Sequence, residues 1–402
     1  MQLLQEGDLE KPQLYQTNPR HRKMKIKHLT KDQNWVERLE SLGYGYHTDG
    51  NQPYWIDHYY YSISEEVADQ IFKATEELWQ MCLEAVQHVI DHKKYHLFQI
   101  PPYLHHYIEK TWNEDVPSLY GRFDFAYDAI KKQLKMLEFN ADTPTSLFEC
   151  GVVQWYWKEH FFGNKKDQFN SVHDQLIDTW KYLKPYLKGD KLYFTCVRES
   201  LEDLTNVEYL RDTAIQAGIS TELLYIDEIG WNGQYFTDLN EEPITSIFKL
   251  YPWEWMAHEE FGHHIVNDVN ETQWIEPSWK QLLSNKAILP ILWELFPNHP
   301  LLLESYFDSP KGMSQYVKKP LLSREGANVS FHVNGQEIFA TDGDYGEEGF
   351  IYQQLATLHK EHSGFSIIGS WLIGQEPCGI TFRESDYPIT TDKSRFIPHI
   401  IE

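Results

Sequence analysis

Two short stretches that alternate apolar and polar residues constrain the fold more than any other feature: GRFDF at 121–125 and KMLEFN at 135–140. Successive side chains of a β-strand point to opposite faces of the sheet, so each stretch predicts a strand with one apolar and one polar face. If the two strands pair, the polar face gathers a guanidinium, two carboxylates and an amide, from Arg122, Asp124, Glu138 and Asn140. The opposite face, rich in phenylalanine, must then pack on a core.

This polar face has the composition of a magnesium site. Mg²⁺ takes oxygen ligands and usually binds through one or two carboxylates together with substrate phosphates, so Asp124, Glu138 and Asn140 are candidate ligands. The Arg122 guanidinium can bind a carboxylate or a phosphoryl group through two parallel hydrogen bonds. Spacing alone leaves a second interpretation open, a solvated sheet face with ordinary cross-strand pairs.

Two segments predict long helices. Residues 62–94 carry apolar residues at helical period, and Ser62 and Glu65 have the spacing of a capping box. Residues 276–296 show a similar pattern and predict a second helix. The apolar stripe of the first helix indicates a core position and no chemistry.

Strand patterns dominate elsewhere. Residues 192–226 predict a strand from Leu192, a helix and a second strand from Leu223, a unit of the open α/β kind. From about residue 316 onward, short apolar runs alternate with glycine-rich loops, and Asn334-Gly335 predicts a hairpin turn. The fold class is therefore α+β or α/β, with a mostly antiparallel C-terminal third.

A second set of residues has the chemistry of a phosphate site. Lys286 and Lys319 supply positive charge, and SREGAN at 323–328 is a loop of small residues that includes Ser323 and Gly326. Backbone N–H groups of such a loop can bind phosphate oxygens. The loop is not a P-loop, because GxxxxGK[ST] occurs nowhere in the chain. Ordinary surface lysines remain the alternative.

Two further stretches near the C-terminus carry polar groups at strand ends. In DYGEEGFIYQQL at 344–355, Glu348 precedes an apolar run that ends in Gln353 and Gln354. These carboxylate and amide groups can bind an adenine or a ribose, or they can form a polar turn. Arg383 lies at the end of a later strand, where it can neutralise a transferred phosphoryl group or form a structural ion pair.

Charge and cysteine usage exclude several classes of protein. With 36 basic and 60 acidic residues the net charge is −24, which repels phosphate backbones and argues against nucleic-acid binding. The same charge is compatible with a cationic substrate such as a polyamine. The four cysteines form no CxxC pair, and neither a secretion signal nor a membrane span is present, so we expect a cytoplasmic protein.

Several longer sequence segments together resemble the synthetase domain of the glutathionylspermidine synthase family, and more distantly trypanothione synthetase. They are RFDF, LEFNADTPTS, FTCVRESLEDLTNVEYL, FKLYPWEWM, SNKAILPILWELFPNHP, KKPLLSREGANVSF, YGEEGFIYQQL, IIGSWLIGQEPCGITFRES and DKSRFIPHI. They cover most of the chain from about residue 120 to the end, in the order of the family. The resemblance implies an ATP-grasp fold and an ATP-dependent acid–amine ligase that forms its amide bond through an acyl phosphate.

The resemblance also implies a division of the chain and roles for its residues. The expected parts are a largely helical region at 1–115, a pre-ATP-grasp α/β region at 116–245, and an ATP-grasp nucleotide-binding region with a mobile phosphate loop at 246–402. Two Mg²⁺ ions are expected on Asp124, Glu138 and Asn140. The implied roles of the other residues are catalysis for Arg122 and Arg383, nucleotide binding for Lys286, Lys319, Ser323, Gly326, Glu348, Gln353 and Gln354, and substrate binding for Thr143, Thr145, Ser146, Glu199 and Asp392.

The implied partners are a carboxylate donor, small or peptidic, and an amine acceptor such as a polyamine. The family's bifunctional members carry an additional N-terminal amidase domain, and this chain is too short for it, so amide hydrolysis is not expected. Two alternatives stay open: an ATP-grasp peptide ligase or carboxylate kinase with other substrates, and a non-catalytic nucleotide-binding homologue. The sequence does not indicate an oligomeric state.

Overall fold

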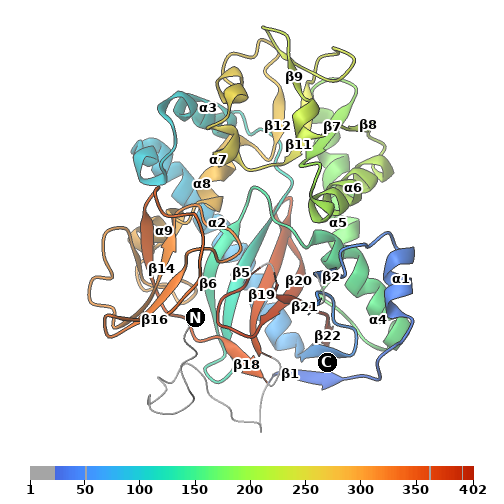
Figure 1. Cartoon of the computed structure of the whole chain (residues 1–402), viewed down its shortest axis with the longest axis vertical. Coiled ribbons are helices and arrows are strands. Elements are labelled where there is room, and N and C mark those ends of the chain that lie inside the picture. The colour runs from blue at the N-terminus through green and yellow to red at the C-terminus, as the bar shows by residue number, and fades with distance from the viewer. Residues whose placement is uncertain (1–22, 50–51, 362–363, 392) are drawn as a thin grey trace.

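A six-stranded antiparallel sheet joins the middle of the chain to its C-terminal part. The structure is a computed structural model, and it describes residues 23–49, 52–361, 364–391 and 393–402. The strand order is β21-β20-β19-β5-β6, with β18 paired to β19. The strands are β5 (Tyr120–Asp128), β6 (Gln133–Asn140), β18 (His359–Glu361), β19 (Gly364–Ile373), β20 (Glu376–Ser385) and β21 (Arg395–Ile397). This sheet lies at the centre of the molecule in Figure 1.

The register of β5 and β6 confirms the two predicted strands and their pairing. Arg122 lies opposite Asn140, and Asp124 lies opposite Glu138. A register shift follows between Asp124 and Phe125. Because directly opposed residues point to the same face of a sheet, all four polar side chains share one face, as the alternation predicts.

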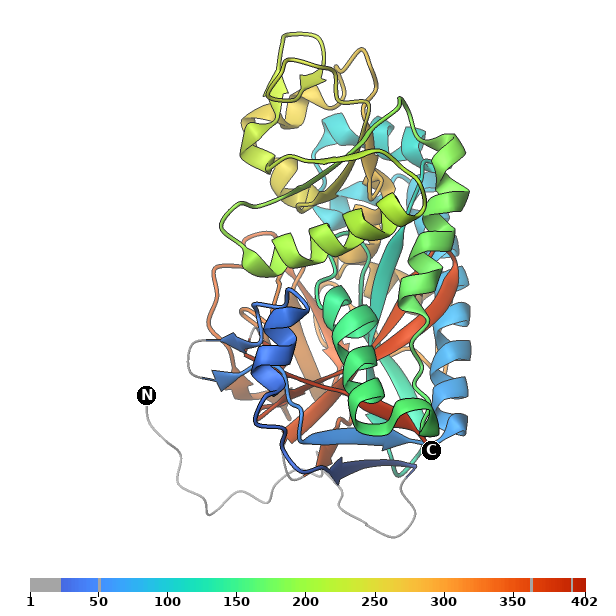
Figure 2. The same ribbon diagram turned by 90° about the vertical axis from the view of Figure 1, so that its right-hand side faces the viewer.

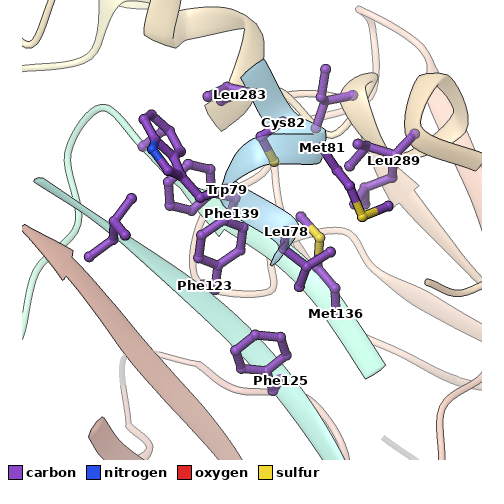
Figure 3. Close-up of a cluster of buried hydrophobic side chains, with 14 of the residues drawn as sticks. Leu78, Trp79, Met81, Cys82, Phe123, Phe125, Met136, Phe139, Leu283 and Leu289 are labelled. Atoms are coloured by element: carbon purple, nitrogen blue, oxygen red, sulfur yellow. The ribbon is translucent and has the colours of Figure 1, made fainter. Parts of the chain in front are cut away.

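The other face of the sheet packs on helix α2 (Glu65–Asp91). Figure 3 shows side chains of this helix, among them Leu78 and Trp79, against the phenylalanine side of β5 and β6. The rings of Phe123 and Phe139 stack at 3.8 Å between centroids. Aromatic residues bury large areas, so this cluster supplies much of the core that holds the site's strands in place.

The predicted start of α2 is wrong by two residues. Ser64, not Ser62, is the N-cap: its extended backbone precedes the helix, and its Oγ accepts a hydrogen bond from the Val67 N–H at 3.4 Å. Ser62 belongs to strand β4 (Tyr59–Ile63), where its hydroxyl donates to Glu402. The strand continues further toward the helix than the capping-box pattern indicated.

A four-stranded parallel sheet confirms the predicted strand–helix–strand unit. Its order is β12-β11-β7-β8. The second strand of the unit begins at Thr221, two residues before the expected Leu223. The elements are β7 (Leu192–Cys196), α6 (Leu201–Gln216), β8 (Thr221–Leu223), β11 (Ser246–Leu250) and β12 (Gln273–Ile275). Figure 2 shows α6 lying crosswise beneath this sheet.

A five-stranded antiparallel sheet confirms the expected character of the C-terminal third. Its order is β13-β17-β14-β15-β16, and it lies beside β6 in Figure 1. The turn between β15 and β16 is formed by Asn334 and Gly335, both at positive φ, as a tight hairpin turn requires. The strands are β13 (Ser305–Tyr306), β14 (Gln315–Pro320), β15 (Ser330–Val333), β16 (Gln336–Ala340) and β17 (Phe350–Gln354).

The segment predicted as one helix over 276–296 is broken. A 3-10 turn (Ser278–Lys280) and α8 (Gln281–Ser284) are separated from α9 (Ile288–Leu295). Asn285 is extended, and its side chain bonds the Ala287 N–H and the Phe98 carbonyl instead of the helix. At the break the backbone N–H of Lys286 donates to the Leu321 carbonyl, so Lys286 does not belong to the apolar stripe of a continuous helix.

The remaining elements cover the ends of the sheets. The two ends of the described chain meet in a three-stranded sheet of order β1-β4-β22. Helix α5 packs against β19 and β20. Among the described residues no helix combines the length and apolar character needed to cross a bilayer. The other strands and α-helices are β1 (Met24–His28), α1 (Trp35–Ser41), β2 (Thr48–Asp49), β3 (Gln52–Pro53), α3 (Pro102–Asn113), α4 (Gln154–Phe162), α5 (Val172–Leu183), β9 (Gly230–Trp231), β10 (Phe236–Thr237), α7 (Trp253–Met256) and β22 (His399–Ile401).

Candidate functional site

Two pockets of different chemistry meet at the polar face of β5 and β6. The first, which we call the polar pocket, encloses about 1320 Å³ together with the open solvent at its mouth and extends toward α6 and α7. The second, the apolar pocket, encloses about 910 Å³ on the same measure and lies against the five-stranded sheet. Its walls include Val317, Val329, Phe331, Leu355 and Ile389. The residues common to both pockets are Asp124, Glu138, Lys286, Ser323, Glu325, Gly326 and Thr390.

Arg122 and Asp124 form a bidentate pair at the floor of the polar pocket. Nε of Arg122 donates to Oδ1 of Asp124 at 2.7 Å, and Nη2 donates to Oδ2 at 3.0 Å. The remaining Nη1 donates to the Thr145 carbonyl at 2.7 Å, and the Asn140 amide donates to Asp124 Oδ2 at 3.0 Å. Burial disfavours the charged guanidinium, but Asp124 outweighs it and raises the pKa of Arg122, which stays charged.

Two buried lysines face the other carboxylate. Nζ of Lys286 lies 3.1 Å from Glu138 Oε2 and donates to the Ser323 carbonyl at 2.7 Å. Lys319 donates to Gln353 Oε1 at 2.8 Å. Burial opposes ionisation of Glu138, yet Lys286 and then Lys319 outweigh it and lower the pKa of Glu138 to about 2. Burial lowers the pKa of Lys319 to about 8, although Glu138 opposes this shift.

The oxygen-bearing side chains of this face fit a magnesium ion. Asp124 and Glu138 are directly opposed carboxylates, a pairing that is unfavourable without a cation between or beside them. Asn140 adds an amide oxygen on the same face. Two carboxylates and one amide oxygen are fewer ligands than Mg²⁺ takes, so an ion held here would complete its shell with phosphate oxygens and water. Within the described residues no three His, Cys, Asp or Glu side chains converge on one point.

The loop between β14 and β15 closes the junction of the pockets. Oγ of Ser323 is buried and has no hydrogen-bond partner among the described residues, so this hydroxyl can donate or accept a hydrogen bond at the junction. Gly326 has φ +66°, and a Cβ there would clash with Ile389 and with the Thr390 carbonyl. Glu348 lines neither pocket; its carboxylate accepts hydrogen bonds from the Leu322 N–H in this loop and from the Gly346 N–H in the loop between β16 and β17.

The loop after β6 forms the opposite wall of the polar pocket. Arg383 donates to Ser146 Oγ at 3.2 Å and lies 4.9 Å from the ring centroid of Tyr54. The Thr143 hydroxyl accepts a hydrogen bond from Arg324 at 2.8 Å, and the carbonyl of Thr145 binds Arg122. The structure therefore brings both predicted threonines to the pocket that both predicted arginines line, whereas Ser146 is buried and bonds Arg383 without lining the pocket.

Other predicted residues lie away from this junction or outside the described chain. Gln353 and Gln354 line the apolar pocket. Glu199 is exposed in the turn between β7 and α6 and lines neither pocket, whereas Glu202 on α6 lines the polar pocket. Asp392 lies outside the described residues.

Sequence reasoning missed the residues that join the pocket walls through distant contacts. Arg324 donates to Glu254 Oε1 through Nη2 at 2.5 Å and through Nε at 3.2 Å, which links the loop to α7. Behind the wall, Lys249 of β11 lies 2.6 Å from Asp142, and both side chains are fully buried. The sequence signal for this buried pair is the lysine inside the apolar strand SIFKL, because a charged residue is rarely buried without a partner.

Comparison with known proteins places the chain in a family. The family model described as glutathionylspermidine synthase preATP-grasp matches residues 26–402. A protein of Haemophilus influenzae described as a candidate acid–amine ligase is 43% identical over 384 residues, covering 90% of this chain and 96% of that protein. The solved apo structure of a glutathione synthetase-like effector from Globodera pallida aligns with a TM-score of 0.54 at 9% identity, covering 85% of this chain and 89% of that one.

Two longer proteins match over part of their length. Trypanothione synthetase of Crithidia fasciculata is 28% identical over 366 residues, covering 84% of this chain and 56% of that protein. The bifunctional glutathionylspermidine synthetase/amidase of Escherichia coli is 28% identical over 405 residues, covering 92% of this chain and 64% of that protein. The chain thus spans about three-fifths of the length of each of these two relatives. The expected ATP-grasp type of fold with a pre-ATP-grasp α/β part is confirmed. The chain belongs to the glutathionylspermidine synthase preATP-grasp family.

Proposed function

We propose that this chain is an ATP- and Mg²⁺-dependent ligase that joins a carboxylate donor to an amine acceptor and releases ADP and phosphate. The observation that carries the proposal is the meeting of an apolar and a polar pocket at two opposed carboxylates and a buried lysine, Asp124, Glu138 and Lys286. A nucleotide base suits the apolar pocket, and charged substrates suit the polar pocket. The names of the relatives, an acid–amine ligase and two synthetases, support the same reaction class.

ATP fits this arrangement with its base in the apolar pocket and its phosphates at the junction. Gln353 and Gln354 lie at the end of β17 and offer amide groups to the nucleotide. Lys286 and Lys319 supply positive charge. The loop around Ser323 offers the free hydroxyl described above and backbone groups to phosphate oxygens.

The ligands for magnesium would be Asp124, Glu138 and Asn140. When bound, the metal would withdraw charge from the phosphoryl group that is transferred. Asp124 would hold the ion in place of part of its hydrogen bonding with Arg122. The Arg122 guanidinium is thereby available to the donor, which it can bind through two parallel hydrogen bonds. We propose two ions at this junction.

The reaction has two halves. The donor carboxylate, held between Arg122 and Arg383, attacks the terminal phosphorus of ATP, and an acyl phosphate and ADP form. A neutral amine then attacks the acyl carbon, the bond to phosphate oxygen breaks, and an amide and phosphate result. Arg383 stabilises negative charge on the phosphoryl group during both halves. The loop at 323–328 excludes water, which would otherwise hydrolyse the intermediate.

The substrate sites are proposed on the loop after β6. Thr143, Thr145 and Ser146 line or border the polar pocket between the two arginines, where a peptide-like donor can bind. The acceptor enters from the side of α6, where Glu202 faces the pocket. Glutathione and polyamines are therefore the first donor and acceptor to test, as the names of the longer relatives suggest.

The experiment is a matrix of substrates. The purified protein is incubated with ATP and Mg²⁺, glutathione or other short peptides as donors, and polyamines or amino acids as acceptors, while ADP release is followed. ADP release that requires both a donor and an acceptor supports the proposal. Measurable ATP binding with no turnover in any combination would establish a nucleotide-binding protein instead. Asp124→Asn is the matched variant that must abolish turnover.

A further inference from the structure

A third pocket, which we call the α6 pocket, opens on a different face of α6 from the polar pocket. It encloses about 1680 Å³ on the measure used for the other two, and none of the described residues lines both it and one of them. Its α6 residues include Leu201, Thr205, Glu208 and Asp212, which recur three or four positions apart, as residues on one face of a helix do. The other walls come from the end of α1, from α4 and from the start of α5, and Figure 2 shows α1 and α4 beneath α6 with α5 beside them.

One wall of the α6 pocket presents exposed apolar side chains. Trp155 and Tyr156, at the start of α4, are 40% and 45% exposed, and their rings meet edge to face with centroids 4.9 Å apart. Leu201, the first residue of α6, lines the same pocket and is 52% exposed. Large apolar side chains that are gathered in one exposed depression are typical of a surface that binds a ligand or a partner.

The floor of the α6 pocket is fixed by buried aromatic contacts. Tyr209 is 5% exposed, its hydroxyl lies 3.3 Å from Nδ1 of His173, and its ring meets that of Phe148 edge to face at 5.6 Å. A Cβ on Gly151 would lie 2.3 Å from the Tyr209 hydroxyl oxygen, so glycine lets the π-helical turn Glu149–Val153 pass this close to the ring. Turns of this kind are rare and occur frequently at functional sites.

The charged side chains of the α6 pocket are mainly carboxylates. Asp174 of α5 and Glu208 and Asp212 of α6 line it, and no lysine or arginine is among the described residues that do. Glu208 pairs with Arg211 at 2.8 Å, whereas Asp174 and Asp212 have no cationic partner in the described part of the chain. A depression lined by charge of one sign concentrates ions of the opposite sign, so this pocket favours a cation.

An unsatisfied oxygen in the lining of the α6 pocket also calls for a hydrogen-bond donor. Asn170 lines the pocket, and its Nδ2 donates to the Cys150 carbonyl at 2.8 Å and to Gln168 Oε1 at 3.2 Å. Its Oδ1 is buried and has no partner among the residues that the structure describes. Buried polar atoms nearly always have a partner, so an N–H group bound in the pocket, directly or through a water, would satisfy this one.

We propose that the α6 pocket is a binding site for an aromatic amine, that is, an ammonium ion attached to a flat apolar ring. The ring packs against Trp155, Tyr156 and Leu201, and the ammonium group is attracted by Asp174 and Asp212. Tryptophan and tyrosine faces also attract cations directly. An anion with the same ring meets repulsion from the carboxylates, and an aliphatic polyamine leaves the aromatic wall uncovered. This site is distinct from the acceptor site of the proposed ligase and does not depend on that assignment.

The test measures binding of three fluorinated compounds that share one ring. 4-Fluorophenethylamine is a cation at neutral pH, 2-(4-fluorophenyl)ethanol is neutral, and 3-(4-fluorophenyl)propionate is an anion. Line broadening of their ¹⁹F NMR signals is followed as the full-length protein is added. We expect saturable binding of the amine, and binding of the anion that is weaker by about tenfold or more, with the alcohol between them. Equal binding of the three compounds, or no binding of the amine up to about 10 mM, would overturn the proposal.

Four variants place the bound amine. Trp155→Ala should weaken binding by about tenfold or more, and because this side chain is partly exposed, the variant should keep the circular dichroism spectrum of the wild type. Asp174→Asn should weaken binding about fivefold. Asp178→Asn, an exposed position on the same helix outside the pocket, is the matched control and should bind as the wild type does. Glu202→Gln, in the polar pocket, should also leave binding unchanged. Binding that survives Trp155→Ala, or that is lost in Glu202→Gln, would contradict the location.

Two further measurements separate this site from its alternatives. Saturating ATP and Mg²⁺ should not displace the amine, because the nucleotide is proposed to bind elsewhere; displacement would assign the amine to the proposed active site and overturn the inference. Failure of the protein to release ADP would leave this result unaffected, so the two proposals fail independently. Sedimentation should show no self-association through this face. A dimer that Trp155→Ala dissociates would identify a second copy of the chain as the occupant instead of the amine.

Discussion

Replacing Glu149 with glutamine should stabilise the fold more at alkaline than at acidic pH. The glutamine keeps the shape of the side chain and can still accept the Tyr44 hydrogen bond, but it cannot ionise. The folded-state pKa of Glu149 is raised from 4.5 to about 7, so the folded protein binds more protons than the unfolded chain between these two values. The wild type therefore loses stability as pH rises through this window.

The magnitude follows from the size of the shift. A shift of one pKa unit corresponds to about 1.4 kcal/mol, so ionisation of Glu149 costs roughly 3 kcal/mol once pH is above the folded-state value. Between about pH 5 and about pH 8.5 the difference in free energy of unfolding between the variant and the wild type should grow by roughly 2 to 3 kcal/mol. The side chain is 1% exposed, so solvent screening does not reduce this value much.

Urea unfolding followed by tryptophan fluorescence measures this difference at both pH values. The wild type and Glu149→Gln are compared at each pH, which cancels the titration of all other groups. Glu84→Gln, exposed on α2, controls for the loss of one negative charge and should show no growth of the difference. A stability difference between Glu149→Gln and wild type that is the same at both pH values would refute the reasoning, because it would mean that the carboxyl does not titrate in the window.

Four other changes test the rest of the site. Asp124→Asn should reduce ADP release by about 10²-fold or more while the circular dichroism spectrum stays that of the wild type, because one of the two opposed carboxylates loses its charge. Lys319→Met should weaken ATP binding about tenfold by calorimetry, and wild-type affinity should fall as pH rises through about 8, where Lys319 loses its proton. Lys249→Met should lower the free energy of unfolding, measured by urea denaturation, by about 3–5 kcal/mol, because it leaves the buried Asp142 carboxylate without its cationic partner. Gly326→Ala should raise the KM for ATP, because its Cβ clashes with the wall opposite the loop.

The parts of the site that the sequence predicts are those with a local pattern. The alternation in GRFDF and KMLEFN places Arg122, Asp124, Glu138 and Asn140 on one face, because the period of a strand depends only on neighbouring residues. The turn at Asn334-Gly335 follows in the same way from local chemistry. Such features survive in the fold because packing of the phenylalanine face fixes the strands without changing their alternation.

The parts that the sequence could not predict depend on contacts across the chain. The apolar pattern over 276–296 favours one helix, but the side chain of Asn285 bonds Phe98, 187 positions earlier, and breaks it. Without that break Lys286 would not reach Glu138. Arg324 likewise gains its place from Glu254, 70 positions away, and from Thr143, 181 positions away. No window of the sequence contains both partners of such a contact.

The distribution of charge explains how one cavity can serve both halves of the proposed reaction. At the junction of the pockets the carboxylates are matched by cations, with Arg122 on Asp124 and Lys286 on Glu138. On the α6 side, burial and repulsion from Glu202 raise the pKa values of Glu149 and Asp203, so negative charge there is incompletely balanced. Anionic groups are therefore drawn to the junction and an ammonium ion to α6. The donor is activated beside cations and the acceptor is held beside carboxylates, so the two requirements do not compete for the same residues.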